Sequence, residues 1–284
     1  MKKILFSVSV GLVALFFLTG CGGSLQTLAE QILYPYQQVN SQFKVPSTPP
    51  KGFTEVTFNF NDQSGKPVHI DAWAYQQPGG SNRTIVYCHG NGENLQALWV
   101  SNFLTVMEEF GANFIVIDYP SYGLSTGAPN QYTLVTAADK AIEWAKQTYP
   151  NNEIIVWGRS LGTGVATLAT GQEQNLVSKL ALTSAWTNFL AVAESVTSLA
   201  SDLPASWVNN NNYNSAAVAP TIHIPVMMQH GTADNTIPIK FGLELKADFT
   251  ASPSVTFYKV PGRGHNNIFG APAVWQELNQ FFRN

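Results

Sequence analysis

Short apolar runs along residues 53–284 alternate with longer segments in which apolar residues recur at helical spacing. Runs of four to eight apolar residues bounded by turn residues are typical of strands, and spacings of three and four are typical of helices. The pattern predicts strands at 53–60, 68–75, 84–88, 113–117, 154–157, 180–182, 226–228 and 255–260. It predicts helices at 94–110, 132–149, 163–169, 237–247 and 271–282.

The order of these elements predicts the fold class. The two strands within 53–75 are joined by a polar turn at 61–66 and are expected to pair as a hairpin. From residue 84 onward strands alternate with helices, which indicates βαβ crossovers and a mostly parallel sheet with helices on both faces. A chain of 284 residues that is 45% hydrophobic can bury one large core. We therefore expect a single α/β domain at 52–284.

One connection is longer than usual for such a fold. Residues 184–221 lie between two predicted strands and contain a segment of helical spacing at 188–203, followed by a run of four Asn. This insertion is either a small cap over a site at the sheet edge or an ordinary crossover helix with a polar loop.

The first twenty residues are expected to be a signal peptide. Lys2 and Lys3 precede an apolar segment, 4–18, that is too short to span a bilayer comfortably. The sequence Leu-Thr-Gly before Cys21 resembles the bacterial lipobox, in which the Cys is acylated after cleavage. The alternative is an ordinary secretory signal that ends near a Cys.

An acylated Cys21, carrying chains such as palmitate, would anchor the protein in the cell envelope on the extracytoplasmic side. Gly22 after the Cys resembles the pattern that enterobacteria sort to the outer membrane, facing the periplasm, if the cell is Gram-negative. Residues 21–51, with Gly at the start and Pro at the end, are expected to be a tether. Within it, 25–36 is expected to form a short helix lying on the domain.

Charge and cysteine content narrow the classes of partner. Charged residues make up 12% of the chain, the net charge is −3, and Lys and Arg form no run, so nucleic acid is not expected as a partner. With Cys21 acylated, Cys88 has no disulfide partner. Cys88 lies in an apolar strand and is expected to be a buried small hydrophobe rather than a nucleophile.

The strongest chemical signal is Gly158-x-Ser160-x-Gly162, which follows the predicted strand at 154–157 and precedes a helix. This is the pattern of a nucleophile elbow, in which a sharp turn exposes a Ser hydroxyl at the edge of a sheet. The two Gly positions remove side chains that would collide in such a turn. A Gly-rich turn with an idle Ser is the alternative.

A Ser hydroxyl needs a base, and the base needs an orienting acid. Among five His residues, His265 follows the strand at 255–260 in a Gly-rich loop, and Asp234 follows the strand at 226–228. The order Ser160, Asp234, His265 places each residue after the carboxyl end of a strand, where open α/β sheets hold their sites. Asp118, which also follows a strand, is a rival for the acid.

Acyl transfer also needs amide donors for the developing oxyanion. The loop at 89–94 reads His-Gly-Asn-Gly-Glu-Asn, and the backbone amide of Asn91 is expected to act there with that of Leu161. A phosphate-binding loop is disfavoured because no Gly-Lys-Ser/Thr ending follows.

Together these motifs resemble the α/β-hydrolase superfamily over nearly all of residues 53–284, and within it the branch with a His-Gly-Asn oxyanion loop. The turn at 118–125, Asp-Tyr-x-x-Tyr-Gly-x-Ser, and residues 207–215 match that branch. Its members are serine esterases, lysophospholipase-like enzymes and acyl-protein thioesterases. Pro120 stands where Arg is often found, which leaves the role of that Arg unfilled.

The resemblance implies a serine hydrolase that cleaves carboxylic ester or thioester bonds, with Ser160, Asp234 and His265 as the triad. A small-molecule or lipid acyl ester is the expected substrate, no metal or organic cofactor is implied, and a monomer is expected. Trp186 and Trp207 are the candidates for the apolar lining of a fairly open site that favours short acyl groups. The alternative is a membrane-anchored binding or scaffold protein on a silenced hydrolase fold.

Overall fold

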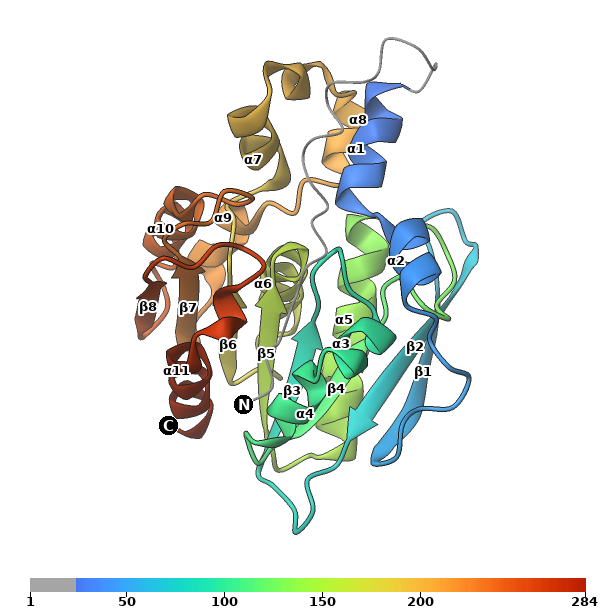
Figure 1. Ribbon diagram of the computed structural model, residues 1–284, viewed down its shortest axis with the longest axis vertical. Coiled ribbons are helices and arrows are strands. Elements are labelled where there is room, and N and C mark those ends of the chain that lie inside the picture. Colours follow the sequence, from blue (N-terminus) through green and yellow to red (C-terminus); the bar gives the residue numbers. More distant parts are fainter. Residues whose placement is uncertain (1–23) are drawn as a thin grey trace.

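An eight-stranded sheet runs through the centre of the molecule (Figure 1). The computed structural model describes residues 24–284. The strand order is β1-β2-β4-β3-β5-β6-β7-β8. β1 and β2 pair antiparallel, β2 pairs antiparallel with β4, and all other neighbours are parallel. The strands are β1 Phe53–Asn61, β2 Pro67–Tyr75, β3 Arg83–Cys88, β4 Asn113–Ile117, β5 Glu153–Arg159, β6 Lys179–Thr183, β7 Val226–Gly231 and β8 Val255–Val260. The predicted fold class is confirmed.

Helices cover both faces of this sheet because alternate residues of each strand point to opposite sides. In β3, Ile85 and Tyr87 pack in a cluster with α3, α4 and α11, whereas Val86 and Cys88 pack in a second cluster with α5, α6 and α10. The helices are α1 Leu25–Leu33, α2 Tyr36–Gln42, α3 Leu95–Val100, α4 Phe103–Glu108, α5 Gln131–Thr148, α6 Leu161–Glu173, α7 Phe189–Val196, α8 Ala205–Asn209, α9 Ser215–Val218, α10 Ile239–Asp248 and α11 Pro272–Arg283. Short 3-10 turns are η2 Ser198–Asp202, η3 Ala219–Thr221 and η4 Ile268–Gly270.

Two predicted helices are broken in the structure. The segment 94–110 divides into α3 and α4 at Asn102, whose φ of 61° is left-handed, a conformation that Asn tolerates better than most residues. The segment 188–203 divides into α7 and η2 at Thr197, which is extended and whose hydroxyl accepts the Leu199 N–H. In both places a local backbone conformation overrides helical spacing.

The described part of the predicted tether at 21–51 packs on the domain. α1 matches the short helix expected there, and α2 follows it. Leu33, Tyr34 and Val39 are buried in the main core cluster. The apolar stripe of α1 needs a partner surface, and the domain supplies it. The signal peptide and Cys21 lie outside the described residues.

The insertion at 184–221 rises from the carboxyl edge of the sheet as α7, η2 and α8, whereas α9 packs against α6 and α10. Figure 1 shows α7 and α8 together with α1 at this end of the molecule. The part of the insertion from α7 to α8 therefore forms a small cap, with α1 from the other end of the sequence as part of it. Within residues 24–284, no helix is long and apolar enough to cross a membrane.

Candidate active site

The turn between β5 and α6 forces Ser160 into an unusual backbone conformation. β5 ends at Arg159, Ser160 has φ 53° and ψ −122°, and α6 begins at the next residue. A Cβ on Gly158 would lie 2.3 Å from the Gly162 carbonyl oxygen, and a Cβ on Gly162 would lie 2.0 Å from the Cys88 carbonyl oxygen. Both glycines are therefore required for this turn, as its sequence predicted.

The loops after β7 and β8 bring the other two predicted residues to Ser160. His265 Nε2 lies 2.8 Å from Ser160 Oγ, and His265 Nδ1 lies 2.8 Å from Asp234 Oδ2. These loops approach closely because Gly231 has no side chain: a Cβ there would lie 2.2 Å from the Arg263 carbonyl oxygen. The structure thus places Ser160, His265 and Asp234 in one hydrogen-bonded line.

Hydrogen bonds keep the Asp234 carboxylate ionised. Burial by itself would raise its pKa, but bonds from His230, His265 and the Ile237 N–H outweigh burial and lower the pKa well below its usual range. An ionised Asp234 fixes the proton of His265 on Nδ1. Nε2 of His265 is then an acceptor for the Ser160 hydroxyl.

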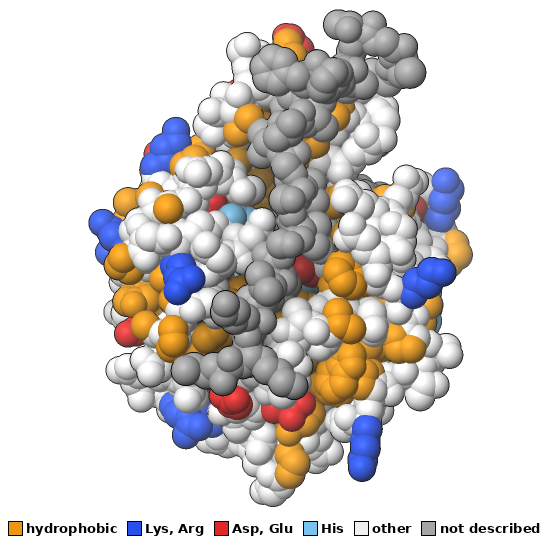
Figure 2. Space-filling view, viewed as in Figure 1, with side chains coloured by type: hydrophobic (Ala, Val, Ile, Leu, Met, Phe, Trp, Pro, Cys, Tyr) orange, Lys and Arg blue, Asp and Glu red, His pale blue; other side chains and the backbone are white. Residues whose placement is uncertain are grey.

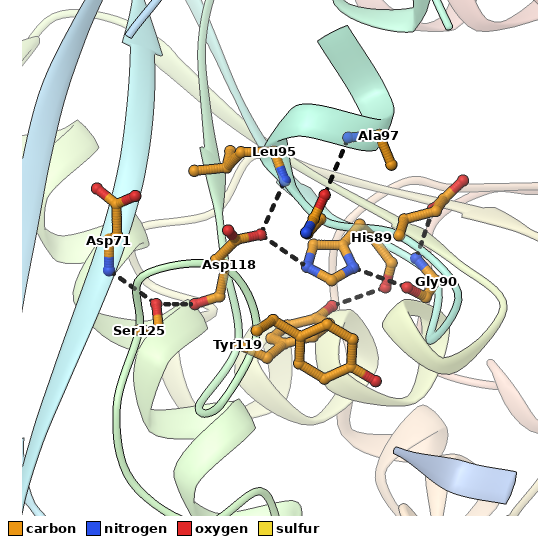
Figure 3. A network of polar contacts seen from close by, with 12 residues as sticks. Asp71, His89, Gly90, Leu95, Ala97, Asp118, Tyr119 and Ser125 are labelled. Carbon is orange, nitrogen blue, oxygen red and sulfur yellow. Dashed lines mark hydrogen bonds and ion pairs between the residues drawn. The ribbon is translucent and has the colours of Figure 1, made fainter. Parts of the chain in front are cut away.

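Asp118, the rival acid, belongs to a different network (Figure 3). Its Oδ1 accepts the Leu95 N–H at 2.9 Å and lies 3.6 Å from His89 Nε2. The Ser125 hydroxyl donates to the Asp118 carbonyl oxygen. Burial raises the pKa of the Asp118 carboxyl. Asp118 therefore contacts the loop at 89–95 and not the ring of His265.

Side chains hold the predicted oxyanion loop from several directions. The Tyr119 hydroxyl donates to the His89 carbonyl oxygen and the Tyr122 hydroxyl to the Asn91 carbonyl oxygen, both at 2.9 Å. Glu93 Oε2 accepts the Gly90 N–H at 2.8 Å. Because the Gly90 amide is already bound, it is not free to bind an oxyanion, and the Asn91 amide remains a candidate donor in this loop. Asn91 and Leu161 both line the same cavity as Ser160.

That cavity has a volume of about 360 Å³, and Ser160 and His265 lie in its wall. Trp186 lines it, as predicted, but Trp207 does not. Trp207 packs on Phe189, and its indole N–H donates to Glu30 Oε1 at 3.0 Å. Trp207 therefore connects the cap to α1. α1 supplies a second wall of the cavity, which the expectation of a fairly open site did not include.

The fold is shared with solved esterases. The Pyrococcus furiosus esterase Pf2001 aligns with a TM-score of 0.64 and 18% identity over 84% of this chain and 94% of that one. Est1E from Butyrivibrio proteoclasticus aligns with a TM-score of 0.62 and 14% identity over 81% of this chain and 97% of that one. The sequence model described as "alpha/beta hydrolase fold" matches residues 83–207.

The chain has the α/β-hydrolase fold.

Curated relatives extend the comparison to sequence. The uncharacterized protein YfhR of Salmonella typhi is 26% identical over 216 residues, which cover 69% of each chain. The lysophosphatidylserine lipase ABHD12 of Danio rerio is 27% identical over 239 residues, which cover 74% of this chain and 61% of the lipase. These similarities support hydrolase activity in general for this α/β-hydrolase fold.

A buried ion pair at the base of the cavity escaped the sequence analysis. Arg159, next to the nucleophile candidate, pairs with Glu93 of the oxyanion loop. Arg159 Nη2 also lies 3.4 Å from the carbonyl oxygen of His265. The pair thus connects three of the four loops that carry the site: the turn before α6, the oxyanion loop and the loop after β8. The sequence held a signal for this pair: Arg159 lies in an apolar strand and Glu93 in a Gly-rich loop. A charge that is buried in such surroundings needs a partner of opposite charge.

Cys88 is buried in β3, as predicted, and burial raises the pKa of its thiol to about 12. A thiol with so high a pKa is protonated at neutral pH and is not a nucleophile. Among residues 24–284 no group of three or more His, Cys, Asp or Glu is arranged to hold a metal ion.

On the face shown in Figure 2, Lys and Arg side chains lie apart from one another and form no patch. The cap itself contributes none, since residues 24–42 and 184–221 contain no Lys or Arg. The surroundings of the cavity are therefore apolar and polar, with no excess of positive charge.

Proposed function

We propose that the protein is a serine hydrolase that cleaves carboxylic ester or thioester bonds through an acyl-enzyme on Ser160. The observation that carries this proposal is the line from Ser160 Oγ through His265 to Asp234, with 2.8 Å at each step, in the wall of an apolar cavity. A nucleophile, a base and an orienting acid in this order are what acyl transfer requires.

In the proposed reaction Ser160 Oγ attacks the acyl carbon while its proton passes to His265 Nε2. The amides of Asn91 and Leu161 donate to the oxyanion of the tetrahedral intermediate. His265 then gives the proton to the departing alcohol or thiol, and the acyl group remains on Ser160. A water molecule then takes the place of the Ser160 hydroxyl: it loses a proton to His265 and attacks the acyl carbon. The bond to Ser160 Oγ breaks, His265 returns the proton to Oγ, and the carboxylic acid is released.

Two features favour this mechanism electrostatically. Asp234 remains ionised beside His265, so it stabilises the imidazolium that forms in each half-reaction. Leu161 is the first residue of α6, where the N–H groups of the first turn point out of the helix and its dipole favours negative charge.

The proposal predicts that a fluorophosphonate probe labels the protein and stops ester turnover with one probe per chain. The labelled peptide, sequenced by mass spectrometry, should carry the probe on Ser160. A protein that hydrolyses neither esters nor thioesters and takes up no probe would instead be a binding or scaffold protein on a silenced hydrolase fold.

We also propose that Cys21 is acylated and anchors the enzyme in the cell envelope, with a small-molecule or lipid acyl ester as substrate. Cys21→Ser should leave the chain uncleaved and without acyl groups, because the cysteine thiol is the acceptor of the lipid. Mass spectrometry of the mature N-terminal peptide from membranes is the measurement. A mature chain that begins at Cys21 without acyl groups would contradict the anchor.

A further inference from the structure

One wall of the cavity is made by the N-terminal helix α1. Its lining side chains follow helical spacing, so they form one stripe along the helix: Leu25, Leu28, Ala29, Ile32 and Leu33. Ala29 and Leu33 are buried in the core, whereas Leu25, Leu28 and Ile32 are only partly covered. The partly covered members of the stripe face the space of the cavity.

α7 of the cap presents a second apolar stripe to the same space. Phe189, Val192, Ala193 and Val196 line the cavity at spacings of three and four. The charged groups of the cavity and its catalytic side chains lie elsewhere, at Ser160, His265 and the Arg159–Glu93 pair. The cavity therefore has a chemical end, where bonds can be made and broken, and an apolar end between α1 and α7.

Polar contacts hold α1 in place against both the cap and the oxyanion loop. The Tyr34 hydroxyl lies 2.8 Å from Asn211 Oδ1, just after α8 of the cap. Glu30 accepts the Trp207 indole N–H. At the end of the helix that is nearest the site, the Asn91 side chain donates to the Ile32 carbonyl oxygen at 2.8 Å. The apolar wall is thus formed before any ligand binds, and its register against the oxyanion loop is fixed.

We infer that the space between α1 and α7 is the binding site for the acyl chain of the substrate, and that α1 sets the chain length. This inference rests on the proposed function and names its substrate class: esters or thioesters of a single unbranched acyl chain of about eight to twelve carbons. It replaces the expectation of short acyl groups, which assumed the insertion alone as cover for the site. The whole cavity, with a volume of about 360 Å³, holds on the order of a dozen non-hydrogen atoms at the roughly 30 Å³ that a water molecule occupies in the liquid, and this sets the upper limit for an acyl chain that starts at Ser160.

Leu28 is the residue of α1 that tests this most directly. It lies one turn, about 6 Å along the helix, further from the Asn91 contact than Ile32 does. A larger side chain at position 28 should obstruct the distal part of the chain and leave the space beside Ser160 open. Gln31 lies on the exposed side of the same helix and is the matched control.

The first measurement is kcat/KM for p-nitrophenyl esters from two to sixteen acyl carbons, with full-length protein in its membranes. Each methylene that enters an apolar site strengthens binding by about fourfold. We expect kcat/KM to rise at least about tenfold from four carbons to a maximum between eight and twelve. Leu28→Trp should move the maximum to shorter chains by at least two carbons, and Leu28→Phe by fewer, whereas Gln31→Trp should match the wild type.

The second measurement does not depend on turnover. Dodecanoic acid with a terminal diazirine, activated by light in the same membranes, should crosslink to peptides of α1 or α7 in the wild type and in Gln31→Trp. Excess dodecanoic acid should compete, and Leu28→Trp should lose most of the label. Immunoblotting confirms that each variant is present at the wild-type level.

The outcomes separate this inference from the proposed function. Ester hydrolysis with a maximum at two to four carbons, unchanged in Leu28→Trp, overturns the acyl-chain site and leaves the hydrolase standing. Crosslinking that depends on Leu28, without any ester hydrolysis or fluorophosphonate labelling, supports the acyl-chain site and overturns the hydrolase.

Discussion

Ser160→Ala should abolish ester turnover and fluorophosphonate labelling while the protein stays folded. The substitution removes only the Ser160 hydroxyl, which donates a hydrogen bond to His265 Nε2 and would attack the acyl carbon. In a well-studied serine protease, loss of the nucleophile lowers kcat by about 10⁶, and the remaining rate of about 10³ over water comes from the oxyanion hole and binding. We expect a loss of the same order, measured as turnover per folded molecule.

Thermal melting provides the control for this variant. Ala removes no contact with the core, so the melting temperature should stay within a few degrees of the wild type, which corresponds to about 1 kcal/mol or less in the free energy of unfolding. Probe labelling that persisted in Ser160→Ala at another residue, such as Cys88, would show that the nucleophile is assigned wrongly.

Asp234→Asn should lower turnover per folded molecule by about 10⁴. An Asn side chain keeps one oxygen to accept the N–H groups of Thr236 and Ile237, so the turn can survive. It replaces the oxygen beside His265 Nδ1 with an amide, which favours the wrong tautomer and removes the charge that stabilises the imidazolium. Loss of this group costs a factor of this order in the best-studied triad.

Asp118→Asn is the matched comparison, because it makes the same chemical change in the other buried acid. Asp118 contacts Leu95 and His89 but not His265. Turnover per folded molecule should therefore stay within about tenfold of the wild type, whatever happens to the folded fraction. If Asp118→Asn is folded and inactive while Asp234→Asn is active, the acid of the triad is Asp118 and the assignment made here is wrong.

Ser160, Asp234 and His265 could be predicted because the residues next to each of them in the sequence form a recognisable pattern. The spacing of Gly158 and Gly162 around Ser160 reflects a backbone turn that only such a sequence tolerates. Asp234 and His265 follow consecutive strands of a parallel sheet, and the carboxyl ends of such strands meet at one edge. Local sequence patterns, together with the rule that parallel strands end at the same edge of a sheet, were therefore sufficient to predict the triad.

The walls of the cavity could not be predicted in the same way, because they depend on contacts between distant segments. Tyr34 and Asn211 are 177 positions apart, and Glu93 and Arg159 are 66 apart. A nine-residue helix between Gly-rich and Pro-rich stretches looks like a tether until its partner surface is known. Trp207 likewise looks like a pocket residue until Glu30 is seen to accept its indole N–H.

The distance between the proposed anchor and α1 has a kinetic consequence. Ser24, which caps α1, follows Cys21 by only three positions, and three residues span at most roughly 11 Å. With a lipid on Cys21, the start of the helix that lines the cavity stays within about a nanometre of the bilayer surface. Substrates that partition into that bilayer would reach the enzyme by lateral diffusion, at the high effective concentration that a short linker provides. The rate would then follow the mole fraction of substrate in the membrane, and diluting the surrounding solution would leave it unchanged.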